Sequence, residues 1–97
     1  LRKTPPTAVF AATDVLAIGA MHAIKDAGLR IPEDIAVAGY DDIYAAAIVD
    51  PPLTTVRVDR ERIGKAAIVE LMKQIENPET PSRVVTISNE LVIRSST

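Results

Sequence analysis

Two adjacent carboxylates, Asp41 and Asp42, are the residues of this sequence that are best placed to meet a ligand, because they follow an apolar run that ends at Tyr40. Paired-carboxylate acid/base chemistry needs two groups that converge across one bond, and sequence neighbours rarely do so. Adjacent residues at a strand end point to opposite sides, so at most one of the two easily faces a ligand while the other caps the turn. Capping by both is an equally good interpretation.

Aromatic and hydroxyl side chains flank these carboxylates. Tyr40 and Tyr44 could stack on a sugar or purine ring, although packing in a core or an interface explains them equally well. Thr13 and Asp14 follow an earlier apolar run, and either side chain can cap the helix that begins there. His22 has no second base or nucleophile near it, so we interpret it as a packing or interface residue.

Motifs for catalysis or cofactor binding are absent from the sequence. It contains no G-x-G-x-x-G, no phosphate-binding G-x-x-x-x-G-K-[ST] and no G-x-S-x-G. With no cysteine and one histidine, it offers neither thiol catalysis nor a plausible zinc site. We therefore predict no enzyme, no cofactor and no metal.

The elements that would position these residues begin with a βαβ unit. Apolar runs at 7–12 and 35–40 have the length of buried strands, and the segment 15–27 between them has the composition of a helix. Strand, helix, loop and strand in this order predict an α/β fold with a parallel sheet and flanking helices. Ligands of such sheets bind outside the carboxyl ends of the strands, where Asp14 follows the first strand and Asp41 and Asp42 follow the second.

The helix predicted at 15–27 is apolar on almost every side, so it should cover a sheet with one face and a partner element or second subunit with another. Gly28 is expected to end it with a positive φ, and Gly39 has a turn or close-approach explanation. We interpret Gly19 and Gly64 as marks of tight helix packing.

The second half of the chain predicts a strand at 53–58, a helix at 60–76 capped by Asp59, and further strands at 84–87 and 91–93. The segment 43–49 is ambiguous, with three alanines that suit a short helix. The helix 60–76 carries a one-sided apolar stripe, which consists of Ile63, Ala67, Ile68, Leu71, Met72 and Ile75.

Composition describes one ordinary globular domain of 97 residues. Lysine and arginine number 11 against 13 acidic residues, a net charge of −2, which excludes a basic nucleic-acid-binding surface on this chain. No stretch is apolar for long enough to span a membrane, and no signal peptide starts the chain, but the lack of cysteine leaves cytosol and periplasm both open. A start at Leu1 without methionine, running into Pro5 and Pro6, predicts a piece of a longer protein.

Four segments together resemble the bacterial lactose/galactose repressor family (LacI/GalR). They are Ala12-Thr13-Asp14-Val15-Leu16-Ala17-Ile18-Gly19-Ala20, Pro32-Glu33-Asp34-Ile35-Ala36-Val37-Ala38-Gly39-Tyr40-Asp41-Asp42, Pro51-Pro52-Leu53-Thr54-Thr55-Val56, and Glu90-Leu91-Val92-Ile93-Arg94-Ser95-Ser96-Thr97. The first segment also suits periplasmic sugar-binding proteins of related fold. The doubled aspartate and the Pro-Pro-Leu-Thr-Thr-Val run favour the repressors.

The resemblance implies a type I periplasmic-binding-protein-like fold, of which residues 1–97 are the C-terminal part. Members carry a helix-turn-helix headpiece and a two-lobed domain that binds a small effector, commonly a sugar or nucleobase, between its lobes. Residues 5–57 would belong mainly to the C-terminal lobe, 58–88 would cross to the N-terminal lobe, and 89–97 would return. The headpiece would be absent from this chain.

The resemblance also implies roles for particular residues. Asp41 falls where the family places an aspartate that accepts hydrogen bonds from the effector, a task suited to a charged, acceptor-only group. Thr13 stands where many members have an asparagine, so that contact could be lost or the ligand could differ. We carry Asp41, Thr13, Tyr40 and Asp14 forward as the effector-binding set, with Asp14 also suited to the helix cap.

Two further surfaces follow from the resemblance. The predicted interface of a homodimer consists of Ile18, Met21, His22, Ala45, Ile48 and Val49. The predicted hinge, where the chain passes between lobes, consists of Arg57, Val58 and Asn89.

The expected protein is a cytoplasmic repressor whose effector changes its affinity for operator DNA through a headpiece outside this chain. A periplasmic sugar-binding protein of a transport system is the alternative, and an α/β enzyme that acts through Tyr40 and Asp41 is the least favoured hypothesis.

Overall fold

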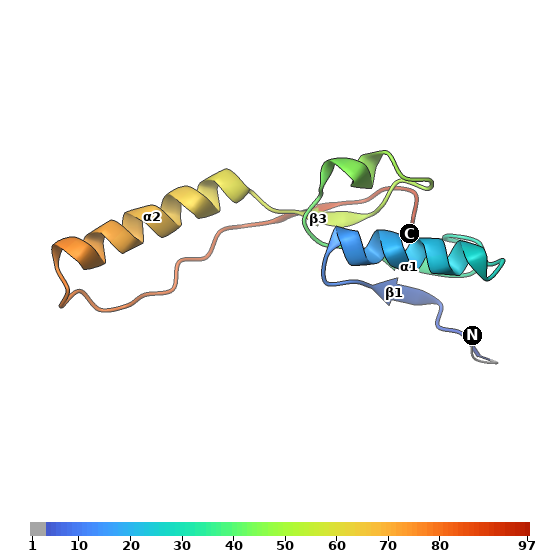
Figure 1. Ribbon diagram of the computed structural model, residues 1–97, viewed down its shortest axis with the longest axis horizontal. Helices are drawn as coiled ribbons and strands as arrows, with labels where there is room; N and C mark the ends of the chain where they lie inside the picture. The colour runs from blue at the N-terminus through green and yellow to red at the C-terminus, as the bar shows by residue number, and fades with distance from the viewer. Residues whose placement is uncertain (1–3) are drawn as a thin grey trace. The chain divides into compact units, whose positions relative to one another are not determined.

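The computed structural model describes residues 4–97 (Figure 1), so the predicted mid-protein start at 1–3 lies outside the described residues. The chain divides into two compact units. Unit 1 contains the described residues up to Val58 together with Glu90–Thr97, and unit 2 contains Asp59–Asn89. No described helix is long and apolar enough to cross a membrane.

Unit 1 is built on the predicted βαβ arrangement, which the structure confirms. Strands β1 (Ala8–Phe10) and β2 (Ala36–Ala38) pair in parallel, and helix α1 (Asp14–Asp26) connects them. The Oγ1 atom of Thr13 accepts the Leu16 amide at 3.2 Å and caps α1. The helix ends beside Gly28, whose φ of 76° is the left-handed conformation that a side chain disfavours.

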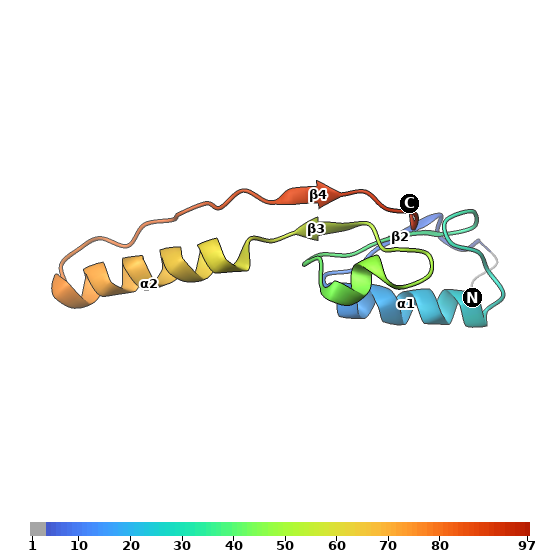
Figure 2. The same ribbon diagram turned by 90° about the horizontal axis from the view of Figure 1, so that it is seen from above.

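A second pair of strands extends this arrangement. Strand β3 (Thr55–Arg57) runs antiparallel to β4 (Glu90–Val92), and the two lie side by side in Figure 2. Next to β2, the Gly39 amide donates to the Thr54 carbonyl at 2.9 Å, in a parallel bridge of residues 38 and 54. The third predicted strand is therefore confirmed, although it is shorter than expected.

The core of unit 1 lies between one face of α1 and the strands. The side chains of Ala17, Met21 and Ile24 from α1 are buried against a set that consists of Ile31, Ile35, Val37, Ala46 and Leu53. The first strand was expected to be buried on both faces, but Phe10 on β1 is 67% exposed. Among the described residues, no element covers that side of β1, which explains the difference.

One residue of the C-terminal segment, Ser96, is buried in unit 1, whereas its neighbours Ser95 and Thr97 are exposed. Ser96 is fully buried, and its hydroxyl donates to the Val37 carbonyl at 2.6 Å and accepts the Thr54 amide at 2.8 Å. Its backbone amide donates to the Pro52 carbonyl at 3.0 Å. A small polar residue near a chain end carries no sequence signal for burial, and the sequence did not predict this one.

The ambiguous segment at 43–49 forms a 3₁₀ helix, η1 (Tyr44–Ala47), which packs its Ala46 side chain into the core of unit 1. In unit 2, helix α2 (Arg60–Glu76) has the predicted bounds and is capped by Asp59, whose Oδ1 accepts the Arg62 amide at 3.0 Å. The predicted helix is thereby confirmed.

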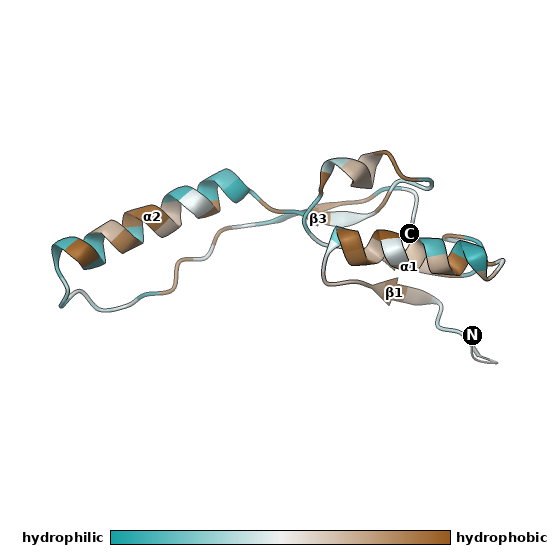
Figure 3. Ribbon diagram, in the orientation of Figure 1, coloured by the Kyte–Doolittle hydropathy of each residue, from teal (hydrophilic) through white to brown (hydrophobic). Residues whose placement is uncertain are grey.

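The apolar stripe of α2 has no covering element within the described part of unit 2. None of its side chains is buried, and Ile75 is 62% exposed. The stripe is the brown band along α2 in Figure 3. The predicted strand at 84–87 is wrong, because none of the described strands lies beside residues 84–87 to pair with them, and an isolated strand is not stable.

Candidate ligand-binding site

Three of the four predicted effector-binding residues come together at the carboxyl ends of β1 and β2. The Asp14 amide donates to the Tyr40 carbonyl at 3.0 Å, which places Thr13 beside the end of β2. The Asp41 amide donates to the Val56 carbonyl at 2.9 Å, which holds that end against β3. Thr13, Tyr40 and Asp41 are all partly exposed at this edge, so their side chains can be reached from solvent.

The backbone at this edge is strained. Asp41 has a φ of 128° and Asp42 a φ of 57°, and both values lie where side chains are disfavoured. Each such conformation costs about 1–3 kcal/mol and persists only where the surroundings hold it. Such strain concentrates at sites of function, which supports a role for Asp41 beyond that of a turn residue.

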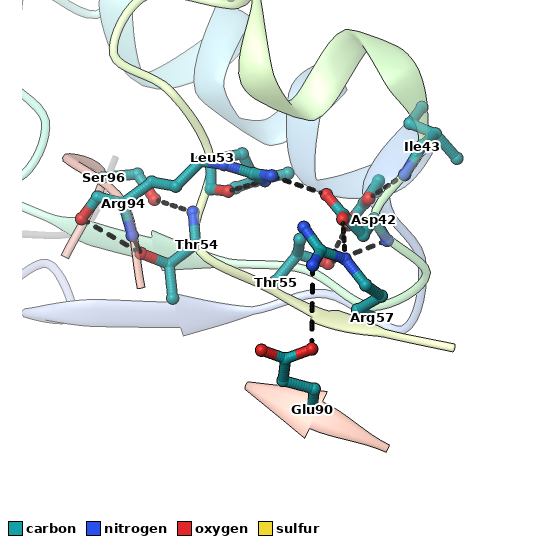
Figure 4. Close-up of polar contacts among 10 residues, drawn as sticks. Asp42, Ile43, Leu53, Thr54, Thr55, Arg57, Glu90, Arg94 and Ser96 are labelled. Carbon is teal, nitrogen blue, oxygen red and sulfur yellow. Dashed lines mark hydrogen bonds and ion pairs between the residues drawn. The ribbon is translucent and has the colours of Figure 1, made fainter. Parts of the chain in front are cut away.

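The Asp42 carboxylate points toward two arginines (Figure 4). Its Oδ2 lies 2.8 Å from Nε of Arg57, and its Oδ1 lies 2.8 Å from Nη2 of Arg94. Burial of the carboxyl opposes its ionisation, but the hydrogen bonds from Arg57 and Arg94 outweigh that effect and hold the pKa of Asp42 below its ordinary value. Asp42 is therefore a structural ion-pair partner, and it does not cap the turn as the sequence had suggested.

Both arginines make further contacts. Arg94 donates from Nη1 to the Leu53 carbonyl at 2.9 Å, and Arg57 lies 3.6 Å from Oε2 of Glu90 on the paired strand β4. Sequence reasoning missed Arg94 altogether. The available signal was a basic residue at the end of the apolar run 91–93, opposite an acidic strand end.

Asp14 has a structural role in this arrangement. The side chain is fully buried, with Oδ1 accepting the Thr55 hydroxyl at 2.6 Å and Oδ2 accepting the Ile43 amide at 2.8 Å. These bonds join the start of α1 to β3 and to the segment after Asp42. Because its carboxylate has no exposed surface, we remove Asp14 from the effector-binding set.

The space around Gly39 differs from that around Gly19 and Gly64. A Cβ atom on Gly39 would lie 2.3 Å from Oδ1 of Asp14, which confirms the close approach predicted there. Gly19 and Gly64 have no atom within 4 Å of a built Cβ, so tight helix packing is wrong for both among the described residues. Both lie on exposed helix positions where nothing covers them.

Four of the six predicted interface residues come together at one groove of unit 1. A groove between α1 and the segment after η1 is lined by Ile18, Met21, His22, Lys25, Val49 and Asp50. The Lys25 ammonium donates to the Asp50 carbonyl across it. Ile48 is 62% exposed, but Met21 is 2% exposed and belongs to the core, which corrects its assignment to a surface.

The predicted hinge residues fall at the boundaries of the two units. Arg57 is the last residue of β3 and pairs with Glu90 in the antiparallel register, while Val58 ends the first stretch of unit 1. Asn89 is the last residue of unit 2. Among residues 4–97, no group of histidine and acidic side chains could hold a metal ion.

Comparisons with known proteins match the whole chain. The model of a family described as a periplasmic binding protein-like domain matches residues 1–97. The transcriptional repressor PurR of Pasteurella multocida is 45% identical over 93 residues, which are 96% of this chain and 28% of that repressor. The chain thus spans less than a third of the length of this relative.

Solved structures agree with this match. The lac repressor dimer bound to operator and the anti-inducer ONPF superposes with a TM-score of 0.84 at 37% identity, over 95% of this chain and 32% of that one. A LacI-family regulator from Enterococcus faecalis with bound ribose superposes with a TM-score of 0.86 at 34% identity, over 98% of this chain and 36% of that one.

Proposed function

The chain belongs to the lactose/galactose repressor family of transcriptional regulators, and from that premise we propose that it is the effector-sensing and dimer-forming part of a cytoplasmic bacterial repressor. The effector is a sugar or nucleobase. Its binding changes the affinity of the natural protein for operator DNA, through a headpiece that lies outside this chain.

One observation carries the proposal. Thr13, Tyr40 and Asp41 meet at the carboxyl ends of parallel strands, and Asp41 is hydrogen-bonded to the strand whose last residue is Arg57. Ligands of open α/β sheets bind at this edge. A ligand at Asp41 therefore contacts the end of β2 next to one of the two places where the chain passes between units.

The chemistry of the site suits a ligand with several hydroxyl or amino groups. In its ionised form, the Asp41 carboxylate accepts hydrogen bonds and donates none. The Oγ1 atom of Thr13 already accepts the Leu16 amide, so its proton remains available to a ligand acceptor. Tyr40 offers a ring for stacking on a sugar or a base.

We assign units 1 and 2 to the C-terminal and N-terminal lobes, with Arg57, Val58 and Asn89 as hinge residues. The unit boundaries after Val58 and Asn89 support this assignment. An effector can shift the lobe arrangement only to the extent that it binds one arrangement better than the other.

We also propose a homodimer through the groove between α1 and the segment after η1, with Ile18, His22, Ala45, Ile48 and Val49 at its interface. The exposed apolar side chain of Ile48 beside a groove supports a partner there. A twofold interface in which both subunits use the same surface is the commonest form of such dimers.

The test is a calorimetric titration of the natural gene product with the common pentoses and hexoses and the five nucleobases. We expect one of them to bind, and Asp41→Asn to weaken it at least tenfold, because the amide replaces a charged acceptor. Asp26→Asn, at an exposed position of α1 outside the groove, serves as the control. If Asp41→Asn leaves the affinity within twofold, Asp41 is not a ligand residue.

The periplasmic binding protein is distinguished by the amino terminus of the natural gene product. Intact mass and amino-terminal sequencing should find a helix-turn-helix segment ahead of this chain. A cleaved signal segment in its place would support a periplasmic receptor and overturn the repressor.

A further inference from the structure

We infer, on the basis of the function proposed above, that Asp42 is a positioning residue that couples the backbone of Asp41 to both strands through which the chain passes between its units. Asp42 would not touch the effector. Its carboxylate would instead make the end of β2, β3 and the segment after β4 move as one piece.

The geometry gives each carboxylate oxygen its own partner. Oδ2 pairs with Arg57, which ends β3, and Oδ1 pairs with Arg94, which follows β4, both at 2.8 Å (Figure 4). One side chain at the end of β2 therefore reaches both crossing strands.

Burial strengthens the contact of Asp42 with Arg94, whereas the Arg57 side chain is 51% exposed. The Asp42 side chain is 11% exposed and that of Arg94 is 17% exposed, so water and salt screen their attraction less than at an open surface. Arg94 is held further by its bond to the Leu53 carbonyl. The Arg94 guanidinium thus has two partners, Asp42 and the Leu53 carbonyl, which makes it the firmer of the two connections.

The strained backbone requires such a connection. Asp41 and Asp42 both have positive φ, a conformation that persists only when surrounding contacts hold it. The Asp41 amide is bonded to Val56 on β3, and the Asp42 carboxylate supplies the second anchor, on Arg57 of the same strand. A displacement of Asp41 by a ligand must then displace the crossing strands as well.

Amide hydrogen exchange of the natural gene product, without any effector, tests the coupling. The variant is Asp42→Asn, which removes the charge but keeps the size and is tolerated at positive φ. We expect peptides that cover residues 39–43 and 89–94 to exchange at least tenfold faster, while the peptide of α1 exchanges at the wild-type rate. A role limited to general stability would accelerate all three alike.

The matched control is Asp34→Asn. It removes the same charge from the pair of Asp34 with Arg30, at 3.2 Å elsewhere in unit 1, and should leave residues 39–43 and 89–94 unchanged. If Asp42→Asn leaves both peptides unchanged, or accelerates α1 equally, the coupling is wrong.

A second variant, Arg57→Gln, decides the matter if Asp42→Asn does not fold. Arg57 is half exposed, so its replacement should be tolerated, yet it should accelerate exchange at 39–43 although it lies on another strand. The two changes combined should accelerate that peptide by less than the product of their separate factors, because they break one shared pair. A double variant whose acceleration equals the product of the two separate factors would contradict the inference. Since no ligand is used, the outcome is independent of whether any sugar or nucleobase binds.

Discussion

The backbone of Gly39 passes so close to Asp14 that a Cβ atom at position 39 would lie 2.3 Å from Oδ1 of that buried carboxylate. Ala17 and Leu53 lie on other sides of the same space, at 3.2 and 3.1 Å from that position. Asp14 cannot move away without losing its bonds to Thr55 and Ile43. The chain can therefore pass this close to the start of α1 only because residue 39 is a glycine.

We predict that Gly39→Ala lowers the free energy of unfolding of the natural gene product by about 1–3 kcal/mol, the usual cost of overpacking. Gly19→Ala is the control. Nothing lies within 4 Å of its Cβ, and alanine is favoured in a helix, so stability should rise by about 0.5–1 kcal/mol. Urea denaturation followed by circular dichroism measures both. Equal effects of the two changes would show that Gly39 has no special fit.

Two substitutions of Asp41 separate its effect on the stability of the fold from its effect on effector affinity. Glycine adopts a φ of 128° without strain and alanine does not, so Asp41→Gly should be about 1–2 kcal/mol more stable than Asp41→Ala. Both variants should lose effector affinity, because both lack the carboxylate. Thermal unfolding and calorimetric titration of the two proteins provide the comparison, and a glycine variant that still binds like the wild type would refute the role of Asp41.

Unit 2 has its own acid-sensitive contact. Oε1 and Oε2 of Glu70 lie 2.5 and 3.0 Å from Arg83, and this hydrogen bonding lowers the pKa of Glu70 from 4.5 to about 2. A carboxyl whose pKa is lower in the folded state stabilises the fold fully above its unfolded pKa and loses that effect as the pH falls through the folded value. The contribution of Glu70 should therefore be present at neutral pH and vanish between about pH 4.5 and 2.

Urea midpoints of the wild type and Glu70→Gln, measured from pH 7 to 2, test this sign. The two proteins should differ at pH 7 and converge toward pH 2. Glu61→Gln, which breaks an exposed pair with Lys65, should differ less from the wild type throughout. A difference that grows as the pH falls would be the opposite of the expected result.

The groove between α1 and the segment after η1 predicts the oligomeric state. Ile48→Glu places a charge on the exposed apolar side chain that precedes Val49, a residue of the groove, and should convert a dimer to a monomer, because an unpaired charge is costly in an interface. Ala23→Glu puts the same charge on an exposed position of α1 outside the groove and should leave the dimer intact. Sedimentation velocity distinguishes the two species, and a dimer that survives Ile48→Glu would place its interface elsewhere.

Local patterns predicted the elements of this chain well. The apolar runs that became β1 and β2, the caps at Thr13 and Asp59, and the glycine after α1 each act through neighbouring residues. The strand expected at 84–87 failed because a strand depends on a partner, and none of the described residues supplies one. The apolar stripe of α2 is exposed for the same reason, because no described element covers it.

The site was only partly predictable. Tyr40 and Asp41 were proposed from their place at the end of an apolar run, but the partners of Asp42 are 15 positions away, at Arg57, and farther still, at Arg94. Contacts at such separations depend on strand pairing and leave no local signal. The burial of Asp14 was missed for the same reason, since its partner Thr55 lies 41 residues away.

The central claim, that this chain serves a DNA-binding regulator, is tested most directly by selection of duplexes from a random pool by the natural gene product. We expect it to enrich a sequence with twofold symmetry, as a symmetric dimer requires, and the sugar or nucleobase that binds at Asp41 to change the affinity for that duplex at least tenfold. A protein that binds its small ligand but enriches no DNA sequence would contradict the account.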